Sequence, residues 1–152
     1  MNAITLLEDD HKELKTLLEK GDDTTERAVK TRAALLQEIA AKLTAHEKIE
    51  EDIFYPALKQ HPKAREIVLE GYQEHHVVDL IMAELKDTAE DDERWAAKFS
   101  VMKENIEHHI EEEEGDMFKT ARAVFTSQEL EELGTRMEQM KGEVLTAHLA
   151  RR

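Results

Sequence analysis

Cysteine is absent from this chain, which excludes disulfide frameworks, thiolate nucleophiles and cysteine-ligated zinc or iron–sulfur sites. Only five Gly and two Pro occur, and aromatic residues make up 5% of the sequence. Glu, Lys, Leu, Ala and Met dominate instead, as they do in helices, so the composition predicts an all-α fold. The apolar runs are only a few residues long, whereas a membrane span needs about 20. We therefore expect no membrane association and a cytoplasmic protein.

Positive charge is also scarce. Lys and Arg number 21 against 35 Asp and Glu, which gives a formal net charge of -14. Such a field repels nucleic-acid phosphates and anionic lipids, so we expect no nucleic-acid partner. The 152 residues, 40% of them apolar, suffice for one hydrophobic core and indicate a single compact unit.

Turn-forming residues divide the sequence into five expected helices. The breaks are Gly21 to Thr24, His61-Pro62, Asp87 to Asp92 and Thr126-Ser127. The expected helices are Asn2 to Lys20, Thr25 to Gln60, Lys63 to Lys86, Asp91 to Ala123 and Ser127 to His148. Thr126 and Glu129 have the spacing of a capping box, in which each side chain bonds the other residue's backbone amide. This box predicts the start of the last helix.

Each of the first four helices carries an apolar stripe that polar residues interrupt. In the first helix, for example, Leu7 and Leu14 flank His11 at helical spacing. The interruptions are His11 in the first helix, His46 and Glu50 in the second, His75 in the third, and His109 and Glu113 in the fourth. These side chains are therefore expected to point into the core.

The interruptions also repeat along the chain. Asp10-His11 matches Glu74-His75 at a shift of 64 residues, and His46-x-x-x-Glu50 matches His109-x-x-x-Glu113 at a shift of 63. A duplicated helical hairpin predicts a four-helix bundle with pseudo-two-fold symmetry over residues 1–125. The helix in residues 126–152 lies outside the repeat. It could serve a partner, but we expect it to cover one face of the bundle.

Buried imidazoles and carboxylates require compensation, because an isolated buried charge is strongly unfavourable. His and Glu four residues apart share one helical face and can bind one cation together. A purely polar network would instead have to neutralise the glutamates without any inward Lys or Arg in the stripes. Imidazole with carboxylate suits a pair of iron ions best, and zinc is second.

At these residues the sequence resembles the hemerythrin family, in the branch named for its His-His-Glu cation-binding motif. The resemblance is carried by Asp10-His11, the segment His46 to Pro56, Glu74-His75-His76 and the segment His109 to Glu114. It implies that the helices of the bundle run up and down and hold a di-iron centre joined by an oxo or hydroxo group. The implied ligands are His11, His46, His75 and His109, with Glu50 and Glu113 as bridges. Glu47 is a further implied ligand, because an iron-sensing ubiquitin-ligase subunit of the family uses the carboxylate in that position.

The sequence departs from the oxygen-carrying members at two points. Those members have His-x-x-x-His on the third helix and His-x-x-x-x-Asp on the fourth, where this chain has His75-x-x-x-Asp79 and His109-x-x-x-x-Glu114. Fewer imidazoles and more carboxylates favour ferric iron over simple oxygen carriage. The resemblance therefore implies interaction with dioxygen, peroxide or nitric oxide in sensing, detoxification or iron handling. Weak redox turnover is compatible with this interpretation, but the sequence settles no enzyme class.

Other interpretations stay open at this point. The chain is alternatively a metal-dependent regulatory module without turnover, or a zinc-binding bundle. A ferritin-like site is disfavoured, because it needs two Glu-x-x-His motifs and only Glu8-x-x-His11 occurs.

The register of the repeat favours His75 over His76 as the ligand, and His76 is then a candidate for an outer position beside the ligands. Tyr55 and Tyr72 could each bond a ligand, although a place at the bundle edge is commoner for tyrosine, and both stay unassigned. Glu114 is expected in solvent.

Overall fold

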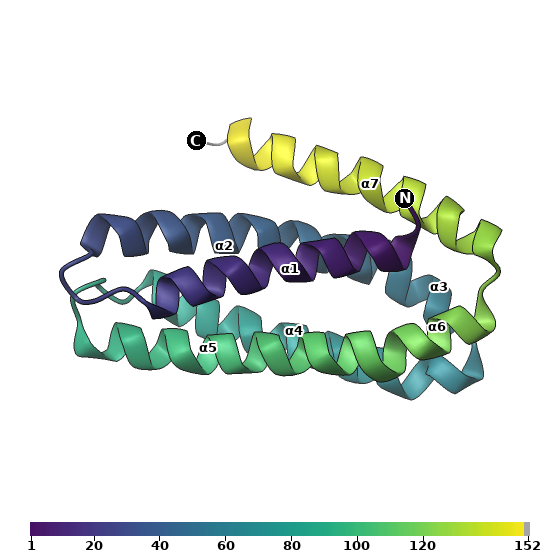
Figure 1. The fold of residues 1–152 in the computed structure, drawn as a ribbon, viewed down its shortest axis with the longest axis horizontal. Coiled ribbons are helices and arrows are strands. Elements are labelled where there is room, and N and C mark those ends of the chain that lie inside the picture. The colour runs from purple at the N-terminus through teal and green to yellow at the C-terminus, as the bar shows by residue number, and fades with distance from the viewer. Residues whose placement is uncertain (151–152) are drawn as a thin grey trace.

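Four long helices run alternately up and down and form a closed bundle in the computed structural model, which describes residues 1–150 (Figure 1). They are α1 (Ala3–Asp22), α2 (Val29–Ile49), α4 (Arg65–Lys86) and α5 (Glu93–Glu112). Helix α1 contacts α2 and α5, and α4 contacts α5 and α2, which closes the ring. The all-α fold expected from the sequence is confirmed.

Two π-helical turns interrupt the second and fourth long segments. The turn η1 (Glu50–Phe54) joins α2 to the short helix α3 (Tyr55–Lys59), and η3 (Glu113–Met117) joins α5 to α6 (Phe118–Val124). Both turns begin at a glutamate that the repeat relates by 63 residues. A π-helical turn accommodates one extra residue and occurs frequently at functional sites. The uninterrupted helices expected from the sequence were wrong at these two points.

Two helix boundaries also differ from the expectation. Gly21 lies inside α1 rather than at a break. A Cβ atom at this position would clash with the ring of Phe99, which explains why the residue is glycine. Helix α2 begins at Val29 instead of Thr25, after a short turn. A 3-10 turn, η2 (Pro62–Ala64), precedes α4. Gly21 therefore allows close packing of Phe99 and does not form a turn.

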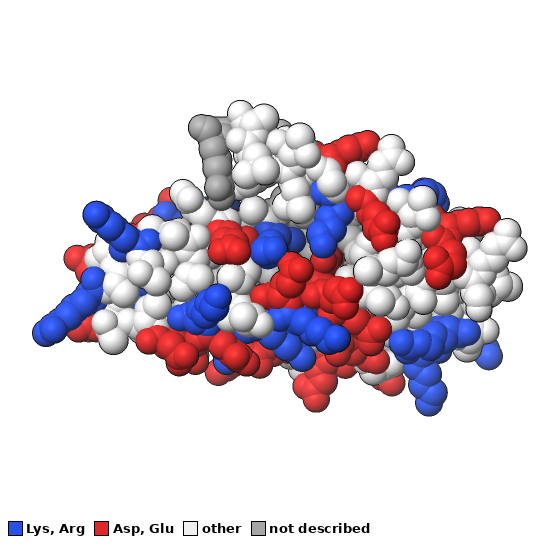
Figure 2. Space-filling view, turned by 45° about the horizontal axis from the view of Figure 1, so that its top comes forward, with Lys and Arg blue, Asp and Glu red and all other residues white. Residues whose placement is uncertain are grey.

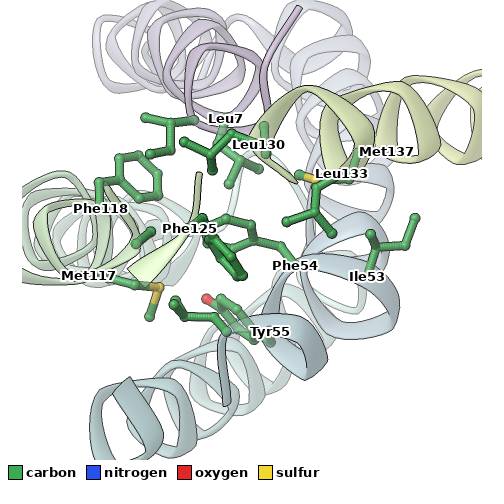
Figure 3. Packing of buried hydrophobic residues seen from close by; sticks show 14 of the residues in the cluster. Leu7, Ile53, Phe54, Tyr55, Met117, Phe118, Phe125, Leu130, Leu133 and Met137 are labelled. Carbon is green, nitrogen blue, oxygen red and sulfur yellow. The ribbon is translucent and has the colours of Figure 1, made fainter. Parts of the chain in front are cut away.

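The last helix, α7 (Ser127–Ala150), lies across α1 and α2 (Figure 1). The capping box is present: the Thr126 amide donates to Glu129 Oε1 at 2.8 Å, and the Glu129 amide donates to Thr126 Oγ1 at 3.1 Å. Leu130, Leu133 and Met137 of α7 converge with residues of α1, α3 and α6 in one hydrophobic cluster (Figure 3). Helix α7 therefore covers one end of the bundle.

The core has two apolar parts with a polar layer between them. The part covered by α7 includes Phe54 and Phe118, and the other includes Trp95 and Phe99. On the face seen in Figure 2, acidic side chains gather near the middle and basic ones lie scattered among them. Within residues 1–150, no helix has both the length and the apolar character needed to cross a membrane.

Candidate metal centre

Six side chains from four helices meet in the polar layer, and all are buried. They are His11 from α1, His46 from α2, His75 from α4, His109 from α5, and Glu50 and Glu113 at the first residues of the two π-helical turns. These are the six residues at which the apolar stripes were interrupted in the sequence. The four-helix topology thus brings together residues that lie up to about a hundred positions apart in the chain.

The six side chains form two groups that share one glutamate. The first consists of His11, His46 and Glu113, and the second of Glu50, His75, His109 and Glu113. In each group, the candidate ligand atoms lie within 4.8 Å of one another. Glu113 Oε1 is 2.9 Å from His11 Nε2, and Glu113 Oε2 is 3.0 Å from His109 Nε2. One carboxylate therefore faces both groups, with one oxygen toward each.

Glu50 is placed in a similar way. Its Oε1 atom is 3.0 Å from His75 Nε2 and 3.2 Å from His46 Nε2. Among the six side chains, two buried atoms nevertheless have no hydrogen-bond partner. They are Glu50 Oε2 and His46 Nε2, and the approach of His46 Nε2 to Glu50 lacks hydrogen-bond geometry. Unpaired buried polar atoms are rare and costly in proteins. This donor set of imidazole nitrogens and carboxylate oxygens fits a cation that would satisfy both atoms.

A carboxylate accepts a hydrogen bond from the outer nitrogen of each imidazole. The Nδ1 atoms of His11, His46, His75 and His109 pair with Glu114 at 2.7 Å, Asp10 at 2.9 Å, Glu51 at 2.8 Å and Glu74 at 2.6 Å. Such bonds orient the ring and leave Nε2 free to bind a metal. The expectation that Glu114 is solvated was therefore wrong. Its position directly after Glu113, like that of Glu51 after Glu50, was the signal in the sequence.

Tyr55, which the sequence left unassigned, belongs to the site. Its ring is fully buried, and its hydroxyl donates to Glu113 Oε2 at 2.6 Å. The π-helical turn accounts for this position, because Tyr55 lies five residues after Glu50 and an α-helix would place it on another face. Burial and the nearby charges of Glu113 and Glu50 raise the pKa of Tyr55 well above its usual value. The hydroxyl thus remains a donor.

Replacing Tyr55 by phenylalanine is expected to lower the free energy of unfolding of the metal-free protein by about 1.5 to 3 kcal/mol, the range for hydrogen bonds to charged groups. Urea denaturation measures this loss. Tyr72→Phe is the matched control, because that half-buried hydroxyl donates only to the Glu51 carbonyl at 3.3 Å. An equal effect of both substitutions would show that the Glu113 contact has no special strength.

Protonated histidines balance the buried carboxylates when no metal is bound. Burial disfavours the His46 cation, but Glu50 and the hydrogen bond to Asp10 outweigh it and raise the pKa of His46 to about 10. Burial likewise disfavours ionised Glu50, yet the charge of His46 holds the pKa of Glu50 well below its usual value. Arg32, the one buried Arg or Lys within residues 1–150, bonds Thr24 and the Glu90 carbonyl at the loop end instead. A metal cation bound among these side chains would displace the protons.

Glu47 is buried beside this layer but belongs to neither group. Burial and the neighbouring Asp79 raise the pKa of Glu47 to about 10, and its Oε2 atom has no partner. The residue lines a small cavity of about 10 Å³, room for about one water molecule. The other lining residues are His11, Leu14, Leu43, His46, His75, Val78, Ile106, His109 and Ile110. His76, the candidate for an outer position, is exposed to solvent.

Known proteins resemble this chain over almost its full length. The sequence profile of the hemerythrin HHE cation binding domain matches residues 2–121. The uncharacterized protein Rv2633c of Mycobacterium tuberculosis and its counterpart in Mycobacterium bovis are each 32% identical over 150 residues, covering 95% of this chain and 91% of theirs. The crystal structure of an HHE domain-containing homolog of Rv2633c from Mycobacterium kansasii superposes with a TM-score of 0.81 at 29% identity. It covers 99% of this chain and 98% of that one.

Proposed function

The chain belongs to the hemerythrin HHE cation-binding family, and we propose on that premise that it binds two iron ions in the polar layer. The observation that carries the proposal is the Glu113 carboxylate, which directs one oxygen toward each of two ligand groups. His11 and His46 would hold one ion, and His75 and His109 the other. Glu50, which faces His46 and His75, would be the second bridge.

Iron is favoured by the chemistry of the donors. Neutral imidazole suits iron, zinc, copper and nickel, while bridging carboxylates suit pairs of iron or manganese ions. Iron satisfies both preferences, and zinc is the second choice. Glu47 remains a proposed additional ligand, because its unpaired Oε2 atom is buried beside His46.

The proposed ligand of the bound iron is a small molecule such as dioxygen, peroxide or nitric oxide. The cavity above the imidazoles has room for about one water molecule. Leu14, Leu43, Val78, Ile106 and Ile110 provide its apolar wall, which excludes larger and charged molecules. A bound iron pair would supply redox chemistry and open coordination positions, whereas the protein orients the imidazoles, excludes bulk water and keeps the Tyr55 hydroxyl as a hydrogen-bond donor to Glu113.

Ligand binding tests this proposal directly. The protein is loaded with iron, and its near-ultraviolet charge-transfer absorption is recorded before and after addition of azide, peroxide or nitric oxide. The bands are expected to shift with at least one of these, and peroxide consumption would reveal turnover. Iron-loaded protein whose bands respond to none of the three would contradict an accessible coordination position.

The second candidate function is a regulatory module whose folding depends on metal, and the observation that favours it is the contact of α7 with α1 and α2. Both functions share one expectation. Removing the metal with a chelator is expected to lower the free energy of unfolding by about 3 kcal/mol or more when the metal had been present at 100 times its Kd, because only the native state binds it. Thermal unfolding and protease resistance measure the change. Equal resistance of the metal-free and metal-loaded protein would contradict the regulatory function, and with it metal binding by the native state.

A further inference from the structure

Helix α7 reaches the polar layer through a single charged side chain. Its buried residues Leu130, Gly134 and Met137 lie on one face, and Lys141 is the next residue on that face, four positions after Met137. At Gly134 the helix touches the backbone of Met1 and Asn2, where a Cβ atom would clash. This close crossing fixes α7 against the start of α1 and brings Lys141 to Asp10.

The ammonium group of Lys141 pairs with Asp10 Oδ1, and the other oxygen of Asp10 accepts the Nδ1 proton of His46 at 2.9 Å. Asp10 is buried, and Lys141 is half-buried. A continuous chain of contacts therefore runs from the last helix through Asp10 to an imidazole of the metal centre.

The surroundings of Asp10 explain why a cation is needed there. A hollow of about 380 Å³ between α1 and α7 is lined by Asp10 together with Asp9, Glu13 and Glu138, and by one Lys, Lys141. Glu138 pairs with the amino terminus of Met1 at 3.5 Å, and Glu13 pairs with Lys42 at 2.8 Å. Within residues 1–150, the one Lys or Arg that pairs with Asp10 is Lys141, and its charge offsets the repulsion from the neighbouring carboxylates. Lys141 thus holds Asp10 in the position where it accepts from His46.

The two halves of the sequence repeat differ at this point. Glu74 takes the place of Asp10 in the second half and accepts from His109 Nδ1 at 2.6 Å. Its other close partner is the Glu112 carboxylate, and within residues 1–150 it forms no ion pair with Lys or Arg. Of the four imidazoles, only that of His46 is therefore connected to α7 through its carboxylate partner.

We propose that Lys141 is a positioning residue for His46, so that docking of α7 sets the affinity of the ion bound by His11 and His46. The inference rests on the proposed function, because it concerns one of the two ions. Hydrogen-bond partners of metal-binding imidazoles typically change metal affinity by about 10- to 100-fold. Lys141 contacts such a partner, Asp10, rather than the imidazole itself. Its loss weakens the binding of one ion and leaves the binding of the other unchanged.

The test compares three variants of the full chain. Lys141→Met removes the charge but keeps the length of the side chain, and Lys141→Arg keeps the charge. Arg136→Met removes one charge from an exposed position of the same helix. Competition with a chelator during iron loading is expected to show about tenfold weaker binding of one ion in Lys141→Met. Binding by Lys141→Arg and Arg136→Met is expected to match the wild type. Equal weakening of both ions, or none, would overturn the inference.

A second measurement separates this inference from the proposed function. Nuclear magnetic resonance of the imidazole nitrogens in metal-free protein reports the Asp10–His46 bond without iron. Lys141→Met is expected to shift the His46 signals and leave those of His109 unchanged. Unchanged His46 signals would overturn the inference, whereas a shift in a protein that binds no iron pair would overturn the proposed function alone. Gly134→Ala, which forces α7 away from α1 with Lys141 present, is expected to shift the same signals, and unaltered signals would contradict the role of α7.

Discussion

Replacing Glu113 by alanine is expected to abolish binding of both metal ions, because this carboxylate is the member shared by the two ligand groups. The metal-free protein is expected to lose about 3 to 5 kcal/mol of stability, the usual cost of removing one partner from a buried charged pair. His11, His109 and Tyr55 would each lose a partner at 2.6 to 3.0 Å. Metal analysis after iron loading and urea denaturation measure the two effects.

The control for this substitution is Glu111→Gln, which removes a charge from an exposed position two residues away on α5. That variant is expected to bind two ions and unfold like the wild type. A Glu113→Ala variant that retained two irons with an unchanged absorption spectrum would show that Glu113 does not bridge the ions.

The metal-free protein is expected to become less stable as the pH rises from about 6.5 to 10. The pKa of His46 is raised from 6.5 to about 10 in the native state, and that of Glu47 from 4.5 to about 10. The native state thus holds protons that the unfolded state has released, so its stability falls with pH in this window. With two such protons, the free energy of unfolding is expected to fall by about 1 to 3 kcal/mol per pH unit. Urea denaturation at several pH values with a chelator present measures this slope.

Metal-loaded protein is expected to respond differently. Metal binding displaces the same protons, so the affinity for metal rises with pH. The difference in stability between metal-loaded and metal-free protein is therefore expected to widen from pH 6.5 upward. A metal-free protein whose stability was constant or rose between pH 7 and 9 would contradict the proton balance derived for the centre.

The sequence alone predicted the elements that follow from periodicity. The helices and the inward position of six polar residues depend on a 3.6-residue repeat, which is visible in one chain. The capping box at Thr126 depends on a local spacing of three residues, which is equally visible. The 63- and 64-residue shifts also related the two halves correctly. The register of that repeat, rather than helical periodicity, favoured His75 over His76, and the structure buries the first and exposes the second.

Other parts of the site could not be read from periodicity. The π-helical turns change the register by one residue and bring Tyr55 to Glu113, so the α-helical pattern could not assign Tyr55 to the site. The carboxylates that bond the outer imidazole nitrogens, such as Glu114, depend on the distance between helices. The contact of Lys141 with Asp10 depends on how α7 crosses α1, which the sequence does not specify.

The number of iron ions per chain tests the central claim most directly. The metal-free protein would be loaded with ferrous iron without oxygen, freed of excess metal, and analysed for iron and zinc against protein concentration. Two irons per chain in the wild type, and none in Glu113→Ala, are the expected results. One iron per chain, or a wild-type protein that retains zinc and does not bind iron, would contradict a di-iron centre bridged by Glu113.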